Sequence, residues 1–346
     1  MFSTQIIQWH RHHGRTTLPW QIKPSPYKTL VSEIMLQQTQ VETVIRYFNR
    51  FITRFPDIGT LAKAREGTVM AHWSGLGYYR RARNLHLSAR HIYKHFSGDI
   101  PSEIEDLLIL PGIGISTAGA IRSLAFNMPG TILDGNVIRV LTRYLGIELN
   151  IKNSTNLKVI KERADQLLPK QSFDEYSQGM MDLGALICKK KSPQCDQCPI
   201  SVKCHANTHH LQDRFPLSIA KNKIPTRSQV ALLIKDKQSN SMLLKKRADG
   251  NVWPGLYAIP IFSDIPSVNE WLVSNTLAKL KVKQSTKTCL ITFSHFKLSL
   301  TIYIVSVNSN KIKIAGPKFV WANKANINKI GVPQFIKKLI VEWQDD

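Results

Sequence analysis

Residues 110–121 read LPGIGISTAGAI, and this stretch decides how the first half of the chain is expected to fold. Gly112 and Gly114 predict a tight hairpin, because glycine lets the backbone turn sharply and approach a ligand closely. The residues from Ser116 onward predict the start of a helix. The free N–H groups and the dipole at a helix N-terminus favour an anion such as a nucleic-acid phosphate. An ordinary corner between two helices would give the same short motif, so the surrounding residues must decide.

The charge of the chain favours a polyanionic partner. Its 346 residues include 47 Lys and Arg against 24 Asp and Glu, which gives a formal net charge of +23. A field of that sign attracts nucleic acid and raises the rate of encounter with it. DNA, RNA and an anionic membrane surface all remain compatible with charge alone, and so does a general lysine-rich composition.

No sequence signal directs the chain into or across a membrane. No apolar run approaches the ~20 residues of a transmembrane helix. The first residues, MFSTQIIQWHRHHGR, lack the apolar core of a signal peptide. We therefore expect a cytoplasmic protein, in which thiols stay reduced. The length predicts two domains, because one hydrophobic core rarely grows beyond ~250–300 residues.

Hydrophobic periodicity divides the chain into a helical part and a β-rich part. Apolar residues at helical spacing dominate residues 1–187. Helices are predicted there near residues 60–73, 80–96, 103–109, 116–126, 135–145, 154–168 and 174–187. After Gln229, VALLIK, SMLLKKR, TCLITF and KLSLTIYIVSV predict strands, and WLVSNTLAKL and PQFIKKLIVEW predict flanking helices. We therefore predict a mainly α domain over residues 1–205, a linker over 206–228 and an α+β domain over 229–346.

Four of the five cysteines gather in one segment: Cys188, Cys195, Cys198 and Cys204. In a reducing compartment such a cluster predicts a metal site rather than disulfides. Four thiolates suit structural zinc or an iron–sulfur cluster, and the C-x6-C-x2-C-x5-C spacing does not choose between them. The fifth, Cys289, is expected to be a small buried apolar residue.

Two carboxylates are candidates for catalysis. Glu33 lies in a largely apolar helix, YKTLVSEIMLQQTQ, where burial would raise its pKa and make it a general acid. A salt-bridged surface glutamate is the commoner alternative. Gln37 and Gln38 follow one helical turn later, from where amides can address base edges. Asp134, in ILDGNVIRV, is a candidate N-cap, and its charge could equally stabilise an oxocarbenium-like sugar.

Two further segments are candidates for contact with nucleic acid. Residues 75–83, GLGYYRRAR, combine a flexible turn and Tyr78 with three arginines. Such aromatics can wedge into a base stack while the cations meet phosphates. Lys189, Lys190 and Lys191 fall in the first cysteine loop, where a bound metal would present their charges rigidly to phosphate. A solvated charge run is the ordinary alternative for these lysines.

Together these motifs resemble the adenine DNA glycosylases of the MutY type, within the helix–hairpin–helix superfamily of DNA glycosylases. The matching segments run in order over residues 18–204: LPW, SEIMLQQTQV, GLGYYRRARN, LPGIGISTAGAI, ILDGNVIRV, MMDLGALIC and the four-cysteine spacing. The resemblance implies a mainly α helix–hairpin–helix glycosylase domain with an iron–sulfur loop, followed by an α+β Nudix-like domain that recognises 8-oxoguanine. It also implies one 4Fe–4S cluster on the four cysteines.

The resemblance implies roles for the matching residues. Glu33 would protonate the leaving adenine, and Asp134 would stabilise the positive sugar. The substrate-binding and DNA-binding residues implied in the same way are Trp20, Gln21, Gln37, Gln38, Tyr78, Gly112, Gly114, Ser116, Gln178, Lys189, Lys190, Lys191, Phe293, Ser294 and His295.

Three departures from related patterns refine this expectation. Ser116 stands where strand-cutting glycosylases carry a lysine that forms a Schiff base, and serine has no amine for that step. Ile115 stands where relatives often have arginine, so a phosphate contact is expected to be weaker. No REx2E segment follows Gly255, so Nudix hydrolysis is not expected.

We therefore predict that a monomeric, DNA-associated cytoplasmic enzyme excises adenine mispaired with 8-oxoguanine or guanine in duplex DNA. The target base would be flipped out of the stack, and the strand would not be cut. A bifunctional pyrimidine-lesion glycosylase of the endonuclease III type is a second hypothesis, disfavoured by Ser116 and by the C-terminal domain. A DNA-binding module without catalysis is a third, disfavoured by the two carboxylates.

Overall fold

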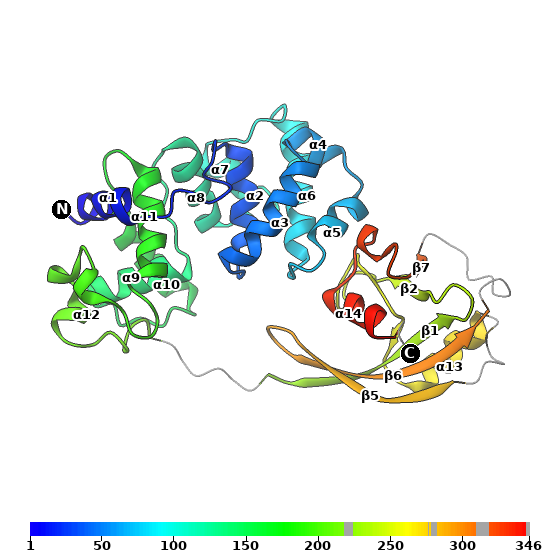
Figure 1. The fold of residues 1–346 in the computed structure, drawn as a ribbon. Helices are drawn as coiled ribbons and strands as arrows, with labels where there is room; N and C mark the ends of the chain where they lie inside the picture. The colour runs from blue at the N-terminus through cyan, green and yellow to red at the C-terminus, as the bar shows by residue number, and fades with distance from the viewer. Residues whose placement is uncertain (218–223, 276, 278–281, 309–317, 344–346) are drawn as a thin grey trace. The chain divides into compact units, whose positions relative to one another are not determined.

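The computed structural model describes the chain except residues 218–223, 276, 278–281, 309–317 and 344–346. It forms two compact units (Figure 1): a helical unit of Met1–Lys63 and Asn84–Ala220, and a C-terminal unit of Ala64–Arg83 and Lys221–Asp346. The segment Ala64–Arg83 thus belongs with the C-terminal unit, although it lies early in the sequence. Residues 218–223 of the predicted linker lie outside the described residues.

The helical unit consists of helices joined by short connections. These are α1 (Phe2–His13), α2 (Pro26–Leu36), α3 (Val41–Arg54), α4 (Ile58–Lys63), most of α6 (Arg80–His95), α7 (Ile104–Leu108), α8 (Ile115–Phe126), α9 (Gly135–Leu145), α10 (Ser154–Asp165), α11 (Phe173–Leu186) and α12 (His205–Thr208). Two short 3-10 turns, Cys195–Gln197 and Ser201–Lys203, lie in the cysteine segment.

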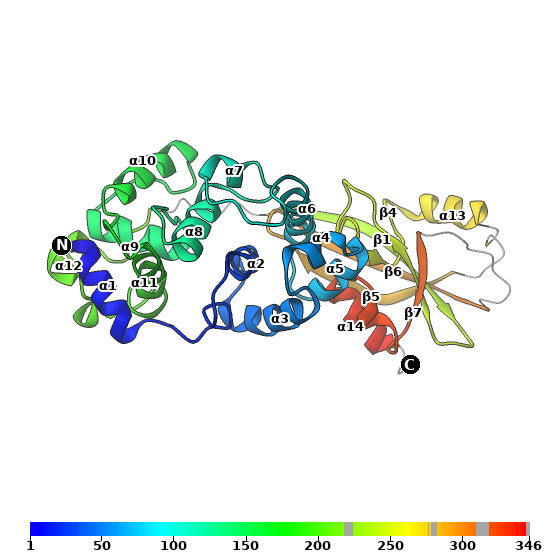
Figure 2. The same ribbon diagram turned by 90° about the horizontal axis from the view of Figure 1, so that it is seen from above.

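One hydrophobic core joins the N-terminal helix to the later helices of this unit. α1 crosses α11 and packs against it, and α9 also packs against α11 (Figures 1 and 2). The centre of this core consists of side chains that are at most 1% exposed: Ile6, Val140, Leu141, Ile160 and Leu183. Each fully buried aliphatic side chain of this kind stabilises the fold by roughly 1.5–3 kcal/mol. α2 packs against α3 and α8, which holds it at the centre of the site described below.

The predicted hairpin connects α7 to α8. Gly112 has a φ of 84°, and a Cβ at this position would lie 2.8 Å from the Cβ of Asn84, so the turn requires glycine. Gly114 is the N-cap of α8, and Asn127, in the left-handed conformation, is its C-cap. The prediction of a hairpin followed by a helix is therefore confirmed.

A mixed β-sheet forms the framework of the C-terminal unit. Its strands are β1 (Thr226–Asp236), β2 (Met242–Lys246), β3 (Tyr257–Ala258), β4 (Ile261–Phe262), β5 (Lys283–Thr292), β6 (Lys297–Val307) and β7 (Phe319–Ala322). The order is β3-β2-β1-β6-β5, with β4 paired to β1 and β7 paired to β2. β1 and β6 run parallel, in a register that pairs Leu232 with Tyr303, whereas β5 and β6 are antiparallel.

Helices complete the C-terminal unit. They are α5 (Glu66–Trp73), α13 (Ile265–Ser274) and α14 (Gln334–Trp343), with a 3-10 turn over Ile327–Lys329. α13 packs against β1 and β4. The core beneath it contains Leu232, Ile234, Leu243, Val268 and Leu272. Burial alternates along β6 from Leu298 to Ile302 and then shifts by one residue, so that the opposite face, with Tyr303, Val305 and Val307, packs on this core.

Two sequence predictions for this unit need correction. The helix predicted over WLVSNTLAKL begins earlier, at Ile265, and ends at Ser274. Asp264 caps it by accepting a hydrogen bond from the N–H of Ser267 at 2.9 Å, and a proline lies in its first turn. Cys289 is half-buried rather than buried, because it lies on β5 at the end of the strand order. Among the described residues, no helix has the length and apolarity needed to cross a membrane.

Candidate active site

Glu33 lies on α2 among buried apolar side chains. Ser25 caps this helix by accepting from the N–H of Lys28, and Leu30 and Ile34 are at most 1% exposed. Burial of the carboxyl, reinforced by the negative charge of Asp134, raises the pKa of Glu33 from 4.5 to about 7. Glu33 can therefore hold a proton near neutral pH, as a general acid must.

Asp134 is the N-cap of α9. Its Oδ1 accepts hydrogen bonds from the N–H groups of Asn136 at 3.0 Å and Val137 at 2.7 Å. Burial raises the pKa of Asp134, while these two N–H groups and the nearby Arg139 act in the opposite direction. The structure therefore brings the two sequence-predicted carboxylates together, and it fixes Asp134 by helix capping.

The segment before Asp134 is fitted tightly against α8. The Oγ of Ser116 accepts a hydrogen bond from the N–H of Leu133 at 2.9 Å. A Cβ on Gly119 would lie 2.2 Å from the carbonyl oxygen of Thr131, so the two backbones touch. Ser116 and Gly119 thus set the path of the chain that ends at Asp134.

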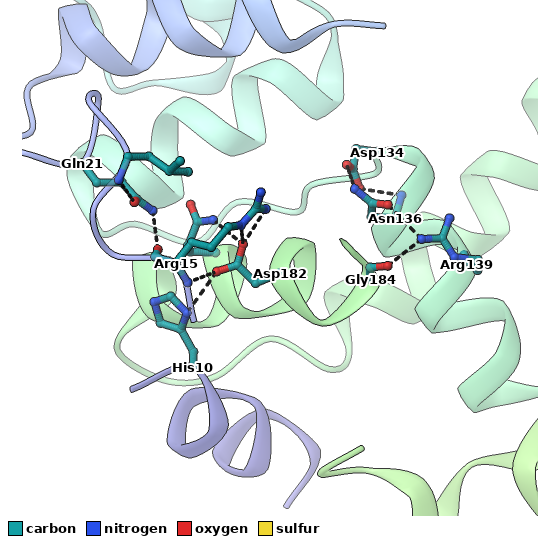
Figure 3. A network of polar contacts seen from close by, with 10 residues as sticks. His10, Arg15, Gln21, Asp134, Asn136, Arg139, Asp182 and Gly184 are labelled. Atoms are coloured by element: carbon teal, nitrogen blue, oxygen red, sulfur yellow. Dashed lines mark hydrogen bonds and ion pairs between the residues drawn. The ribbon is translucent and has the colours of Figure 1, made fainter. Parts of the chain in front are cut away.

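A polar network ties Gln178 of α11 to the segment that follows α1 (Figure 3). Asp182 is fully buried and accepts from the backbone N–H of Arg15 at 2.7 Å and from its Nε at 2.8 Å. Gln178 donates to the same carboxylate at 2.9 Å, and His10 Nδ1 lies 3.6 Å from it. Although burial acts in the opposite direction, His10 and Arg15 hold the pKa of Asp182 below its usual value.

The same network orders the loop that carries Trp20 and Gln21. The side chain of Gln21 donates to the carbonyl of Arg15 at 2.8 Å and accepts from the N–H of Leu18 at 3.0 Å (Figure 3). Trp20 is only 8% exposed and packs edge-on against Phe48. The structure therefore joins Gln21 and Gln178 through one set of contacts, and it buries Trp20 against Phe48 of α3.

Arg139 connects α9 to the end of α11. It donates to the side-chain oxygen of Asn136 at 2.8 Å and to the carbonyl of Gly184 at 2.7 Å (Figure 3). It also donates to the carbonyl of Cys188 at 2.7 Å. Asn136 in turn donates to Asp134 at 3.2 Å. Hydrogen bonds thus run without interruption from the carboxylate to the first cysteine.

The four clustered cysteines line one cavity, whose walls include Ile187 and Ala206. Burial raises the pKa of Cys198 to about 12; the N–H of Ile200 opposes this rise, and each of the other three thiols adds a smaller increase. Among the described residues, no three His, Cys, Asp or Glu side chains are placed to share a single metal ion. Four thiols around one cavity are a donor set that suits structural zinc or an iron–sulfur cluster.

Arg143 fixes the loop that carries these cysteines. This arginine is 2% exposed, and its guanidinium donates to the carbonyls of Lys189 at 2.7 Å, Lys190 at 3.2 Å and Gln212 at 2.9 Å. The side chains of Lys189, Lys190 and Lys191 are exposed. A buried cation therefore holds the backbone from which three exposed cations project.

The remaining candidates of the helical unit lie near the start of α8 or after α2. Gln37 donates to the Oγ1 of Thr117 at 3.2 Å, so this amide lies beside the hairpin helix. Gln38 is exposed and has a left-handed backbone, with a φ of 57°. Ile115, where the sequence lacks an arginine, is 50% exposed.

The candidates in the C-terminal unit form two separate features. Tyr78 is 48% exposed at a turn between α5 and α6. Phe293 packs between Trp253, with ring centroids 5.8 Å apart, and Phe296, with centroids 4.7 Å apart. The neighbouring Ser294 and His295 are exposed, and their side chains lie 3.2 Å apart. Aromatic packing thus anchors the loop that presents these two polar groups.

Sequence reasoning did not single out four residues that organise the site: Arg15, Asp182, Arg139 and Arg143. A signal was present for Asp182, which interrupts the apolar run MMDLGALIC with a carboxylate, as Glu33 interrupts its own helix. The arginines left no such signal, because an arginine that donates to backbone carbonyls looks like any surface cation in the sequence.

Comparisons with known proteins agree with this architecture. Residues 31–166 match the HhH-GPD superfamily of base excision DNA repair proteins, and residues 230–342 match a NUDIX domain. The adenine DNA glycosylase of Buchnera aphidicola subsp. Baizongia pistaciae is 39% identical, over 99% of this chain and 96% of the relative. That of Buchnera aphidicola subsp. Acyrthosiphon pisum is 35% identical, over 99% and 98%.

Among solved structures, a thermostable thymine-DNA glycosylase is 27% identical, with a TM-score of 0.55, and the match covers 60% of this chain and 95% of that one. The predicted fold class, a helix–hairpin–helix glycosylase domain with a Nudix-like domain, is confirmed. Because the two adenine DNA glycosylases match this chain from end to end at 39% and 35% identity, the chain belongs to the adenine DNA glycosylases.

Proposed function

We propose that this adenine DNA glycosylase removes adenine mispaired with 8-oxoguanine or guanine in duplex DNA, through base flipping and without cutting the strand. The observation that carries this proposal is the pairing of Glu33, whose pKa is raised to about 7, with Asp134. One carboxyl is suited to donating a proton and the other to opposing a positive charge. Burial raises the pKa of both carboxyls, but at Asp134 two backbone N–H groups and Arg139 oppose that rise and favour the charged form.

The reaction breaks the bond between the sugar C1′ and the adenine N9. Glu33 donates its proton to the adenine ring, which leaves as a neutral base, and the sugar develops positive charge. Asp134 stabilises that charge, as a carboxylate does in glycoside hydrolysis. Water then adds to C1′, and Glu33, now a carboxylate, accepts the proton that the water releases. Flipping is required because C1′ is not accessible to these groups within the base stack.

The absence of strand cleavage follows from Ser116. A Schiff-base mechanism needs an amine at the sugar. Ser116 instead supplies a hydroxyl, whose oxygen already accepts a hydrogen bond from the N–H of Leu133. The abasic site would therefore remain attached until alkali or another enzyme breaks the strand.

One 4Fe–4S cluster is the cofactor that the four cysteines fit. Cys188, Cys195, Cys198 and Cys204 share one cavity, and burial keeps the pKa of Cys198 high in the absence of a metal. When bound, the cluster would supply a rigid cross-link of the loop. Arg143 would hold the backbone of that loop, and its exposed lysines would meet phosphates.

The DNA-binding residues divide into phosphate and base contacts. Gly112, Gly114 and the N-terminus of α8, which includes Ser116, would bind phosphate together with Lys189, Lys190 and Lys191. The residues proposed to contact the bases around the mispair are Trp20, Gln21, Gln37, Gln38, Tyr78 and Gln178, with Phe293, Ser294 and His295 at the 8-oxoguanine. We propose that the enzyme acts as a monomer in the cytoplasm, on DNA.

The test is a single-turnover assay on a duplex that holds adenine opposite 8-oxoguanine, analysed with and without alkali. We expect strand breaks only after alkali treatment, and we expect Glu33→Gln to bind the mispair without releasing adenine. Breaks without alkali would show lyase chemistry and contradict the role given to Ser116. Near-normal cleavage by Glu33→Gln would remove Glu33 from the mechanism.

A further inference from the structure

The turn that presents Tyr78 is held in an unusual backbone shape. Gly75, Gly77 and Tyr78 have φ values of 105°, 79° and 48°, and such a conformation is disfavoured for tyrosine. The indole N–H of Trp73 and the guanidinium of Arg81 both donate to the carbonyl of Gly77, at 3.1 and 3.3 Å. The guanidinium of Arg81 also lies over the ring of Tyr78, 5.1 Å from its centroid. The surrounding contacts therefore stabilise a half-exposed aromatic in one orientation.

Two hydroxyls fasten this turn to a segment more than two hundred residues later in the chain. The Oγ of Ser74 donates to the carbonyl of Val332 at 2.6 Å, and the hydroxyl of Tyr79 approaches the same oxygen at 3.3 Å. The hydroxyl of Tyr79 also accepts from the N–H of Gly75 at 3.1 Å. Ser74, Tyr79 and Val332 are 2%, 9% and 0% exposed. Because Val332 is fully buried, its carbonyl needs hydrogen-bond donors from within the protein, and the two hydroxyls supply them.

The chain on either side of Val332 is fixed as well. A Cβ on Gly331 would lie 2.9 Å from the Cβ of Met70, so the segment lies directly against α5. The carbonyl of Gly331 accepts from the N–H of Tyr257 on β3 at 2.9 Å, which ties the same segment to the sheet. Any displacement of this segment must therefore either move the hydroxyl of Tyr79, the residue next to Tyr78, or break its hydrogen bond.

We propose that Ser74 and Tyr79 are positioning residues, through which the C-terminal unit holds Tyr78 in the orientation needed to probe DNA. The pair of hydroxyls on the Val332 carbonyl, which we name the hydroxyl lock, links the sheet to the Tyr78 turn. This inference rests on the proposed contact of Tyr78 with the DNA bases. It assigns a function to two buried polar residues that neither touch substrate nor belong to the catalytic pair.

The experiment is a double-mutant cycle on the cluster-containing full chain. The variant Ser74→Ala/Tyr79→Phe removes both hydroxyls and preserves most of the packing. We expect the single-turnover rate on adenine opposite 8-oxoguanine to fall roughly tenfold, as loss of two buried hydrogen bonds would allow. In a Tyr78→Ala background the same two changes should cost less than ~2-fold, because the residue that they position is already gone. The single variant Ser74→Thr keeps a hydroxyl at position 74 and should retain most of the wild-type rate.

A matched control separates this role from a general loss of packing. Ser123→Ala removes another fully buried serine hydroxyl, on α8, and should leave the rate unchanged. If Ser74→Ala/Tyr79→Phe lowers the rate equally in the wild-type and Tyr78→Ala backgrounds, the proposed role of the hydroxyl lock is contradicted. It is also contradicted if this variant releases adenine at the wild-type rate. If the wild-type protein itself releases no adenine from the mispair, the proposed function fails instead, before the lock is tested.

Discussion

The proton on Glu33 predicts a specific dependence of base release on pH. With a pKa of about 7, Glu33 is almost fully protonated near pH 5.5 and only ~3% protonated near pH 8.5. Because the protonated form is the catalyst, activity is present below the pKa and is lost as the pH rises through it. The single-turnover rate constant should therefore be nearly flat below pH ~6, halve by pH ~7 and fall ~30-fold in total by pH ~8.5.

An unshifted carboxyl would behave differently in the same assay. With its usual pKa of 4.5, Glu33 would lose its proton throughout this range, and the rate would fall ~1,000-fold with no break. The measurement is the rate of alkali-labile site formation with enzyme in excess over DNA but below the Kd, because the rate then reports the free enzyme, to which this pKa belongs. Glu162→Gln, which removes an exposed carboxyl on α10, should leave the profile unchanged. A rate independent of pH over the whole range would refute proton donation by Glu33 as the limiting step.

Four further outcomes are expected. Asp134→Asn should lower the rate of base release more than ~100-fold while DNA affinity stays within ~3-fold, as measured by single-turnover kinetics and fluorescence anisotropy. Ser116→Ala should slow base release ~3- to 10-fold, because a backbone N–H next to the catalytic aspartate loses its acceptor, and a threonine at this position should restore the rate. Metal analysis should find about four irons per chain and no stoichiometric zinc, and Cys198→Ser should lose the visible absorbance of the cluster. Zinc without iron would contradict the cluster. Asp182→Asn should lower the free energy of unfolding by about 3 kcal/mol, because it leaves a partly buried arginine without its partner, whereas the exposed Glu175→Gln should cost less than ~1 kcal/mol in the same urea titration.

The sequence predicted local features well because each had a local physical cause. Glycines with a required conformation marked the hairpin at Gly112, and an aspartate before a helix marked the cap at Asp134. The start of α13 had equally good signals in Asp264 and the proline after it, yet the later apolar run WLVSNTLAKL outweighed them. The two-residue strands β3 and β4 left no pattern, because they depend on the strands beside them.

Long-range polar contacts were beyond the reach of sequence patterns. Nothing around Asp182 in the sequence indicates that Arg15 lies against it, 167 residues away. The membership of residues 64–83 in the C-terminal unit was equally hidden, since the hydroxyls of Ser74 and Tyr79 meet a backbone carbonyl, and a carbonyl has no residue type to recognise. Such long-range contacts determine the position and orientation of the predicted motifs, whereas local sequence patterns indicate only that the motifs are present.

Capping alone does not explain why an aspartate occupies position 134. Asparagine caps helices about as well as aspartate, because its side-chain oxygen accepts from the same N–H groups. Burial penalises only the charged residue, and it raises the pKa of Asp134 despite two N–H donors and the nearby Arg139. The charge is therefore kept at a cost in stability that asparagine would avoid. A negative charge fixed by the cap opposite a developing positive sugar accounts for that cost. It is why Asp134→Asn is expected to leave α9 at least as stable as in the wild type while lowering the rate of base release more than ~100-fold.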